Sequence, residues 1–122
     1  MHAIVGAGTG LGIARGIISG NKVKVLASEG GHVEYSPKSN LEWELKIWLK
    51  NYLKIERISC ERIVSGSGLS RIAEWRLSKP DAQNHPLQKY LKEMKISDSA
   101  RKELPEKICK LSKEGDQLMI EV

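Results

Sequence analysis

Apolar residues near the start of the chain occur in short runs rich in Ile and Val, separated by glycines and single polar residues. Clean alternation of polar and apolar positions, as in the run KVKV, is typical of a half-buried strand. The pattern predicts three strands, and the turn residues Ser19, Gly20 and Asn21 predict a tight hairpin between the second and the third. The predicted strands cover residues 3–5, 12–18 and 22–27.

Beyond residue 40 the apolar residues recur every three or four positions, which is the period of an amphipathic helix. The clearest helix starts at Leu41, where Ser39 and Glu42 form the capping-box pattern. Further helices are predicted over residues 69–78 and 87–94, and the rest is also helical, with interruptions at Pro105 and Gly115. The predicted fold class is therefore mixed α/β, with a three-stranded antiparallel meander followed mostly by helices.

Composition narrows the functional class. The 122 residues, 40% of them hydrophobic, fit one domain with a real core. The net charge is +5, but the basic residues are interleaved with glutamates, which indicates a solvated surface and not a nucleic-acid stripe. No apolar run approaches bilayer length and no signal-peptide pattern opens the chain, so a cytoplasmic protein without a membrane partner is expected.

The two cysteines, Cys60 and Cys109, are isolated in the sequence. Neither has a CxxC partner or a histidine at metal-ligand spacing. In a cytoplasmic chain such residues are expected to be ordinary reduced thiols. We therefore predict neither a disulfide nor a metal centre at these positions.

The segment AIVGAGTGLGIA, residues 3–14, is the first candidate for chemistry, because glycines let backbone amides approach a ligand. A Walker loop is excluded, since no lysine follows these glycines before Lys22. A dinucleotide fingerprint requires a helix after the glycines, whereas the β-branched residues here favour a strand. What remains is a strand, then Gly8, Thr9 and Gly10 (the glycine loop), then a strand. Taken alone, this arrangement suits a plain tight turn as well as a phosphate loop.

Three ordered segments, GAGTGLG, EGGH and ERIVSGSGL, resemble the bacterial glucokinase family, the branch of sugar kinases outside the ROK group. They begin at Gly6, Glu29 and Glu61, and the match extends from residue 3 to about residue 80. A ROK kinase would carry a cysteine-rich zinc motif soon after its EGGH-like segment, but the first cysteine here is Cys60. The resemblance implies the actin-like ATPase fold, with this chain as the first part of the large C-terminal domain.

The resemblance assigns roles to two sets of residues: sugar-binding Glu29, His32 and Glu61, and phosphate-facing Gly8, Thr9 and Gly10. A carboxylate can accept from two neighbouring hydroxyls, and a neutral imidazole can donate or accept, so the first set suits an uncharged polyol. Without the motifs, His32 would be interpreted as a loop histidine bonded to backbone. Glu61 would be interpreted as a charge in the first turn of a helix.

The same resemblance implies residues that this chain lacks. The family's catalytic base is an aspartate after an asparagine, ahead of the second phosphate loop, and its first phosphate loop has the pattern Asp-x-Gly-Gly-Thr-Asn. The three aspartates, Asp81, Asp98 and Asp116, lie in the later helical part, and none matches. A very short first strand and an apolar helical stripe that stops at Val122 add to the expectation of a fragment, truncated at both ends and without a catalytic residue.

The activity implied by the resemblance is ATP-dependent phosphorylation of glucose, or a related hexose, to the 6-phosphate in glycolysis. ATP and Mg²⁺ are the implied cofactors, and a homodimer of the parent protein is an implied assembly. The chain alone is expected to be inactive, because the base and half of the nucleotide site are missing. The alternative is a stand-alone sugar-binding or regulatory module derived from a sugar kinase. A dinucleotide-binding domain, the third hypothesis, requires a helix starting near Gly10.

Overall fold

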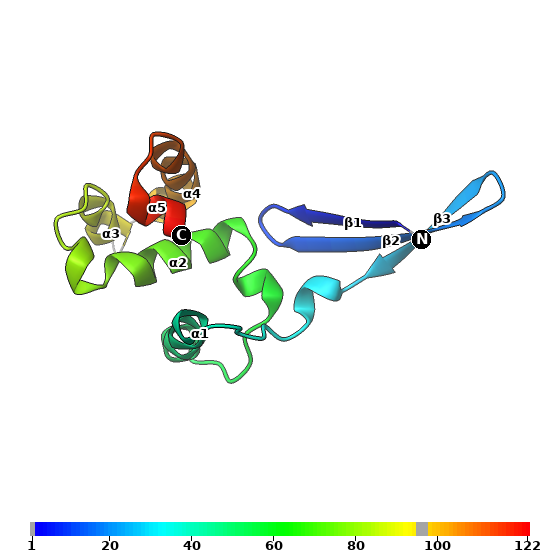
Figure 1. Ribbon diagram of the computed structural model, residues 1–122, viewed down its shortest axis with the longest axis horizontal. Coiled ribbons are helices and arrows are strands. Elements are labelled where there is room, and N and C mark those ends of the chain that lie inside the picture. Colours follow the sequence, from blue (N-terminus) through cyan, green and yellow to red (C-terminus); the bar gives the residue numbers. More distant parts are fainter. Residues whose placement is uncertain (1, 95–97) are drawn as a thin grey trace. The chain divides into compact units, whose positions relative to one another are not determined.

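The computed structural model describes residues 2–94 and 98–122 and contains two compact units (Figure 1). The sheet unit runs up to Gly66, and the helical unit is Ser67–Val122. The elements in chain order are β1 (His2–Ala7), β2 (Leu11–Ser19), β3 (Lys22–Ser28), η1 (Gly30–His32), α1 (Asn40–Leu53), η2 (Cys60–Arg62), α2 (Gly66–Leu77), η3 (Pro80–Ala82), α3 (Gln88–Met94), α4 (Asp98–Lys113) and α5 (Gln117–Glu121). The η elements are single turns of 3₁₀ helix. The predicted mixed α/β class, with antiparallel strands followed by helices, is confirmed.

The strands form an antiparallel meander in the order β1-β2-β3. Ala7 pairs with Leu11, so the glycine loop is a three-residue connection between β1 and β2. Ser19 pairs with Lys22, and Gly20 has a φ of 59°, as the first central residue of a type II′ turn requires. The chain enters a strand directly after the glycine loop, and this excludes the dinucleotide-binding helix.

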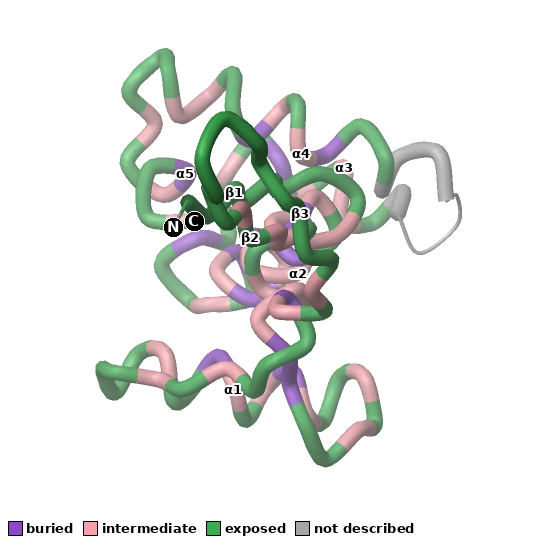
Figure 2. The backbone as a smooth tube through the Cα atoms, turned by 90° about the vertical axis from the view of Figure 1, so that its right-hand side faces the viewer, coloured by how far each residue is buried: buried purple, intermediate pink, exposed green. Residues whose placement is uncertain are grey.

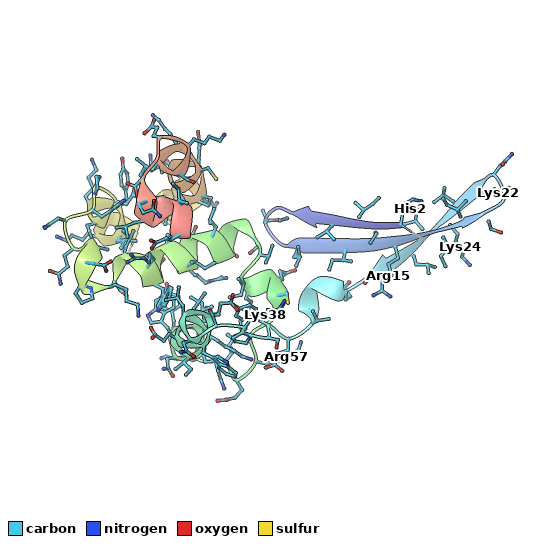
Figure 3. All side chains as sticks on the ribbon, in the orientation of Figure 1. His2, Arg15, Lys22, Lys24, Lys38 and Arg57 are labelled. Atoms are coloured by element: carbon cyan, nitrogen blue, oxygen red, sulfur yellow. The ribbon has the colours of Figure 1, made fainter. Side chains whose placement is uncertain are left out.

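The two faces of the sheet differ, because residues paired across antiparallel strands share a face. Apart from His2, one face carries only glycine and apolar side chains: Ile4, Ala14, Ile18, Val23, Val25 and Ala27. The other face is apolar next to the glycine loop and basic at the far end, where Arg15, Lys22 and Lys24 extend from the strands (Figure 3). Strands β1 and β3 are exposed over nearly their whole length, whereas β2 also contains half-buried residues (Figure 2). Val25 in β3 is 65% exposed.

Helix α1 begins where the capping box predicts. The Ser39 hydroxyl accepts the Glu42 N–H at 3.2 Å, and the Glu42 carboxylate accepts the N–H of Lys38 at 2.7 Å. The reciprocal bond thus reaches one residue further out than in the standard capping box. The helix ends at Leu53, and its C-cap Lys54 has a left-handed φ of 54° and donates its N–H to the Lys50 carbonyl.

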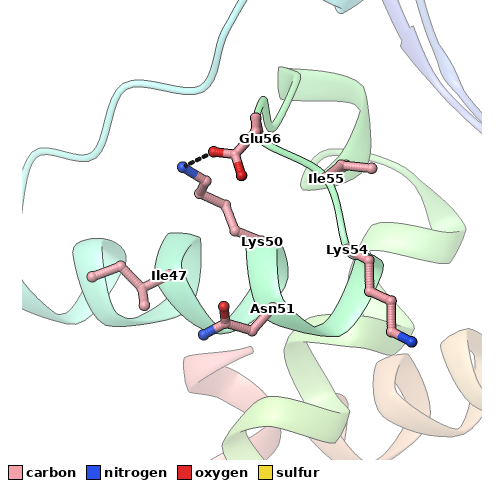
Figure 4. A pocket seen from close by; sticks show the side chains of 6 residues that line it. All are labelled: Ile47, Lys50, Asn51, Lys54, Ile55 and Glu56. Carbon is pink, nitrogen blue, oxygen red and sulfur yellow. Dashed lines mark ion pairs between the residues drawn. The ribbon is translucent and has the colours of Figure 1, made fainter.

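A cavity of about 530 Å³ lies beyond the last turn of α1, lined by Ile47, Lys50, Asn51, Lys54, Ile55 and Glu56 (Figure 4). Lys50 Nζ lies 3.0 Å from Glu56 Oε2, and the Glu56 side chain is 96% exposed. An ion pair this exposed contributes only about 0–1 kcal/mol to stability. Replacement of either partner is therefore expected to leave the sheet unit largely unchanged.

The helical unit has a common apolar core. Its buried members are Ala73, Leu77, Ala82, Leu87, Leu104, Ile108 and Met119. Helix α4 contacts both α3 and α5, and Leu118 and Val122 pack against the core. The apolar stripe at the end of the chain is thus used within this unit.

Two details of the predicted helices are wrong. Pro105 lies inside α4 and does not interrupt it. Proline removes one backbone hydrogen bond, but its neighbours Leu104 and Ile108 are only 0% and 2% exposed, and their packing holds the helix together. Helix α2 starts at Gly66, ahead of the predicted residue 69, because glycines lower helix propensity and conceal the start. Gly115, with a φ of 89°, does separate α4 from α5.

Two further predictions concern the cysteine thiols and the absence of a membrane-spanning segment, and they involve residues in both units. Cys60 in η2 and Cys109 in α4 are both free, as predicted. The Cys60 thiol lies 3.9 Å from the Glu34 carbonyl oxygen. In the part of the chain that is described, no helix is both long and apolar enough to cross a bilayer.

Candidate functional site

The three side chains predicted to bind sugar meet beside the sheet. Glu29 precedes η1, His32 ends η1, and Glu61 lies in η2. His32 Nε2 is 3.5 Å from Glu61 Oε2 and 3.9 Å from Glu29 Oε2. The side chains of Glu29, His32 and Glu61 are 88%, 56% and 36% exposed. The sheet unit therefore presents two carboxylates and an imidazole to solvent at one place.

Two glycines let η1 lie directly on β2. A Cβ atom on Gly31 would overlap the carbonyl oxygen of Leu11, and one on Gly30 would lie 2.9 Å from Ile13 Cδ1. Larger residues would lift η1 off the strand. The EGGH pattern is thus explained by space, because the middle residues must be small for the outer two to reach the site.

A short antiparallel pairing joins the chain after η1 to the chain before η2. The Tyr35 N–H donates to the Ile58 carbonyl at 2.8 Å, and the Cys60 N–H donates to the Val33 carbonyl at 2.9 Å. Ile58 is fully buried. This pairing brings η1 and η2 together, and with them the imidazole and the second carboxylate of the site.

Two cations hold the backbone of this region from the α1 side. Lys46 Nζ donates to Glu34 Oε1 and to the Tyr35 carbonyl, both at 2.9 Å. The hydrogen bond and charge of Lys46 hold the pKa of Glu34 below its ordinary value. Arg57 Nη2 donates to the carbonyl oxygen of His32 at 2.8 Å. The segment that carries His32 is therefore fixed mainly through main-chain oxygens.

The glycine loop lies directly beside Glu61. Glu61 Oε2 accepts the Leu11 N–H at 3.3 Å, and a Cβ atom on Gly10 would be 3.0 Å from the same oxygen. Gly8 donates its N–H to the Gly10 carbonyl, and its own carbonyl accepts the N–H of Gly66, both at 2.8 Å. The structure thus brings the predicted phosphate-facing residues next to a predicted sugar residue.

The glycine loop offers backbone donors to an anion. The N–H groups of Thr9 and Gly10 have no hydrogen-bond partner within the described residues, and Thr9 is exposed. Unpaired amides on a glycine turn suit phosphate oxygens. The glycine loop therefore offers donors that suit a phosphate chain. Among the residues described, no three His, Cys, Asp or Glu side chains form a group that could hold a metal ion.

The aspartates described in the helical unit have other partners. Asp81 receives two hydrogen bonds from the Arg76 guanidinium, at 2.9 and 3.1 Å, which hold the pKa of Asp81 below its ordinary value. Asp116 Oδ2 lies 2.9 Å from His85 Nε2. The side chain of Asp98 lies outside the described residues. Asp81 and Asp116 thus serve contacts within the helical unit.

Sequence reasoning missed the residues that hold the site in place. Lys46 and Arg57 act on backbone oxygens, and a lysine or arginine in or after an amphipathic helix looks like any other surface charge. The contact from Gly66 to the glycine loop was easier to predict from the sequence. The small residues in ERIVSGSGL indicate that two backbone segments approach each other closely there.

Comparison with known proteins finds matches of this chain to one family. The sequence matches the glucokinase family over residues 1–120. It is 42% identical to the glucokinase of Nostoc sp. over 84 residues, which cover 69% of this chain and 25% of that protein. It is 49% identical to the glucokinase of Synechocystis sp. over 74 residues, which cover 60% of this chain and 21% of that protein. The chain spans about a quarter of the length of these curated relatives.

Solved structures of glucokinases are also similar to this chain. The crystal structure of glucokinase from Balamuthia mandrillaris in complex with glucose has a TM-score of 0.61 at 29% identity, covering 88% of this chain and 28% of that chain. A glucokinase from an Antarctic psychrotroph has a TM-score of 0.54 at 30% identity, covering 62% of this chain and 23% of that chain. The likeness to the first structure extends well beyond the motif-bearing residues.

Proposed function

This chain belongs to the glucokinase family, and we propose that it supplies the sugar contacts and one phosphate loop of an ATP-dependent glucokinase. The observation that carries the proposal is the meeting of Glu29, His32 and Glu61, with the imidazole 3.5 and 3.9 Å from the two carboxylates, beside the glycine loop. The proposed reaction transfers the γ-phosphoryl group of ATP to the 6-hydroxyl of glucose. Within such an enzyme the chain would form the first part of the large domain.

The sugar half of the proposal rests on hydrogen-bond chemistry. Ionised carboxylates accept strongly from hydroxyl groups, and each can accept from two neighbouring hydroxyls of a pyranose. The Leu11 N–H bonded to Glu61 fixes the direction of that carboxylate, so less ordering remains to be done when sugar binds. His32 can donate to or accept from a further hydroxyl. An uncharged hexose suits this set better than an anionic ligand, which both carboxylates would repel.

The phosphate half rests on the glycine loop. The free amides of Thr9 and Gly10, with the Thr9 hydroxyl, would bind oxygens of the ATP phosphates. ATP supplies the phosphoryl group, and the Mg²⁺ that accompanies its phosphates supplies charge neutralisation when bound. We assign no catalytic base to this chain, since the described aspartates have partners in the helical unit. The proposed setting is the cytoplasm, with a homodimer of the parent protein as the proposed assembly.

Titration of the 122-residue chain with glucose, followed by calorimetry, tests the sugar half. Binding at millimolar or lower glucose is expected. Glu29→Ala and Glu61→Ala should each abolish it, because each removes an acceptor from the cluster. Glu56→Ala is the matched control, since it removes an exposed glutamate of the same unit whose ion pair is with Lys50. The variants should be compared at equal concentration after circular dichroism has verified their secondary structure.

Two outcomes would contradict the proposal. Absence of binding heat in the wild-type chain would reject the sugar site, and equal loss in Glu56→Ala would show that any change of charge disturbs it. In a coupled assay for glucose 6-phosphate, the chain alone is expected to show no turnover, because we assign no catalytic base to it. Turnover would mean that the base lies within these residues.

A further inference from the structure

We propose that Arg57 is a positioning residue for His32, and that it sets the affinity for sugar through the main chain. This inference rests on the proposed glucose site. The guanidinium of Arg57, which is labelled in Figure 3, donates to the His32 carbonyl at 2.8 Å. Arg57 lies in the sheet unit together with all the predicted site residues. A hydrogen bond from a charged donor is stronger than one between neutral groups.

The His32 carbonyl needs an outside donor. Element η1 is a single turn, held by the His32 N–H to Glu29 carbonyl bond at 3.0 Å and the longer Val33 N–H to Gly30 carbonyl bond at 3.4 Å. The last carbonyls of a helix have no partner within it, and a single turn is not stable alone. Arg57 therefore supplies a bond that η1 cannot supply for itself.

The imidazole takes its position from the main chain at His32, because the polar contacts of its ring with Glu61 and Glu29 are long. The His32 side chain is 56% exposed, and its nearest charged atoms, at 3.5 and 3.9 Å, are too distant to form short hydrogen bonds. Movement of the main chain at His32 would shift the ring relative to Glu61. A shift of about 1 Å is enough to weaken hydrogen bonds that are sensitive to direction.

The backbone around Arg57 is firmly held, so its side chain can hold the His32 carbonyl in a fixed position. It precedes Ile58, which is fully buried and whose carbonyl accepts the Tyr35 N–H at 2.8 Å. The backbone at Arg57 is thereby anchored, while its side chain remains exposed. The guanidinium is always charged and presents its donors in a rigid plane, so a lysine would reproduce the charge but only part of the geometry.

A double-mutant cycle on glucose affinity tests the inference, with dissociation constants measured by NMR titration. The chains are wild type, Arg57→Met, His32→Ala and the double variant. Arg57→Met should weaken binding about tenfold, as expected for loss of a charged hydrogen bond. The double variant should bind no more weakly than His32→Ala, because Arg57 acts through His32. Arg57→Lys should recover part of the affinity.

Lys50→Met is the matched control, because it also removes a positive charge from the sheet unit, and the ion pair that it breaks is the exposed one with Glu56. Its glucose affinity should equal that of the wild type, and the urea midpoints of all variants should be similar. Wild-type affinity in Arg57→Met, or losses that multiply in the double variant, would overturn the inference while the proposed function stands. If the wild-type chain binds no glucose, the proposed function fails and this inference fails with it.

Discussion

In the helical unit the large apolar side chains meet in a common core, whereas in the sheet unit most of those on the strands lie at the surface. Leu77, Leu104 and Ile108 are 1%, 0% and 2% exposed, but Ile4 and Val25 are 70% and 65% exposed. The candidate site nevertheless lies in the sheet unit. Its geometry therefore depends on close glycine contacts and on hydrogen bonds to backbone, and much less on the packing of a core.

Polar contacts also differ between the units. In the helical unit His85 Nδ1 accepts the Leu87 N–H at 3.1 Å, so its Nε2 carries the proton and donates to Asp116 at 2.9 Å. Asp116 also accepts the Met119 N–H at 3.1 Å and so caps α5. Every polar atom of this histidine is used for structure. In the sheet unit, by contrast, the site histidine keeps a ring open to solvent.

The largest expected effect is a loss of stability when a side chain in the core of the helical unit is truncated. Leu104→Ala should destabilise the helical unit by about 2–5 kcal/mol, because it leaves a cavity at a fully buried position. Val25→Ala, on the exposed face of the sheet, should cost about 0.5 kcal/mol or less. Urea unfolding followed by circular dichroism measures both. Equal losses would show that the strands are packed as firmly as the helices, and the contrast between the units would be wrong.

A smaller effect, confined to the sheet unit, is expected for Gly31→Ala. The added methyl group would overlap the Leu11 carbonyl, and such overpacking costs about 1–3 kcal/mol. Because η1 would move away from β2, glucose binding should be lost while the NMR signals of the helical unit stay in place. Gly20→Ala, at the hairpin turn, is a control for the general cost of changing a glycine, and it should retain glucose binding.

The smallest expected effect is the acid sensitivity of the helical unit. Burial opposes ionisation of Asp116, but hydrogen bonds from the Met119 N–H and from His85 outweigh it and hold the pKa of Asp116 below its ordinary value. A carboxyl group with a lowered folded-state pKa stabilises the fold fully above its unfolded pKa of about 3.9, and this stabilisation is lost as the pH falls through the folded value.

The urea midpoint of the helical unit is therefore expected to be flat above about pH 4 and to fall below it. Asp116→Asn should reduce this fall, and a residual slope should remain from Asp81, whose pKa is also lowered. A fall of the same steepness in Asp116→Asn would assign the acid sensitivity to other carboxyl groups. The variant should be compared with the wild type at constant ionic strength.

Local rules account for the parts of the fold that sequence alone predicted. The meander follows from alternating residues and a Gly20 turn, and the start of α1 follows from the pairing of Ser39 with Glu42. Pro105 was misjudged because its cost is local, whereas the packing of Leu104 on α4 involves other helices. Sequence patterns therefore indicate the local cost of a residue such as proline, but they do not indicate how strongly a helix packs against other helices.

For the candidate site, too, one part could be predicted from the sequence and another part could not. The resemblance named Glu29, His32 and Glu61 through two of the three motifs, EGGH and ERIVSGSGL, and their residue types agree with a polyol ligand. The bond from Leu11 to Glu61 joins residues 50 positions apart, and the bond from Arg57 ends on a backbone oxygen. No residue type encodes a main-chain acceptor, so these contacts become visible only in the folded chain.

The bond between the Leu11 N–H and Glu61 has a practical consequence. The oxygen that would receive a sugar hydroxyl already polarises one particular amide proton, whose nitrogen lies 3.3 Å from that oxygen. Any change in the electron density of that carboxylate must alter the resonance frequency of this proton. The Leu11 amide is thus a spectroscopic reporter within the molecule, and its NMR cross-peak in an isotopically labelled chain registers a ligand at the neighbouring carboxylate without a coupled enzyme.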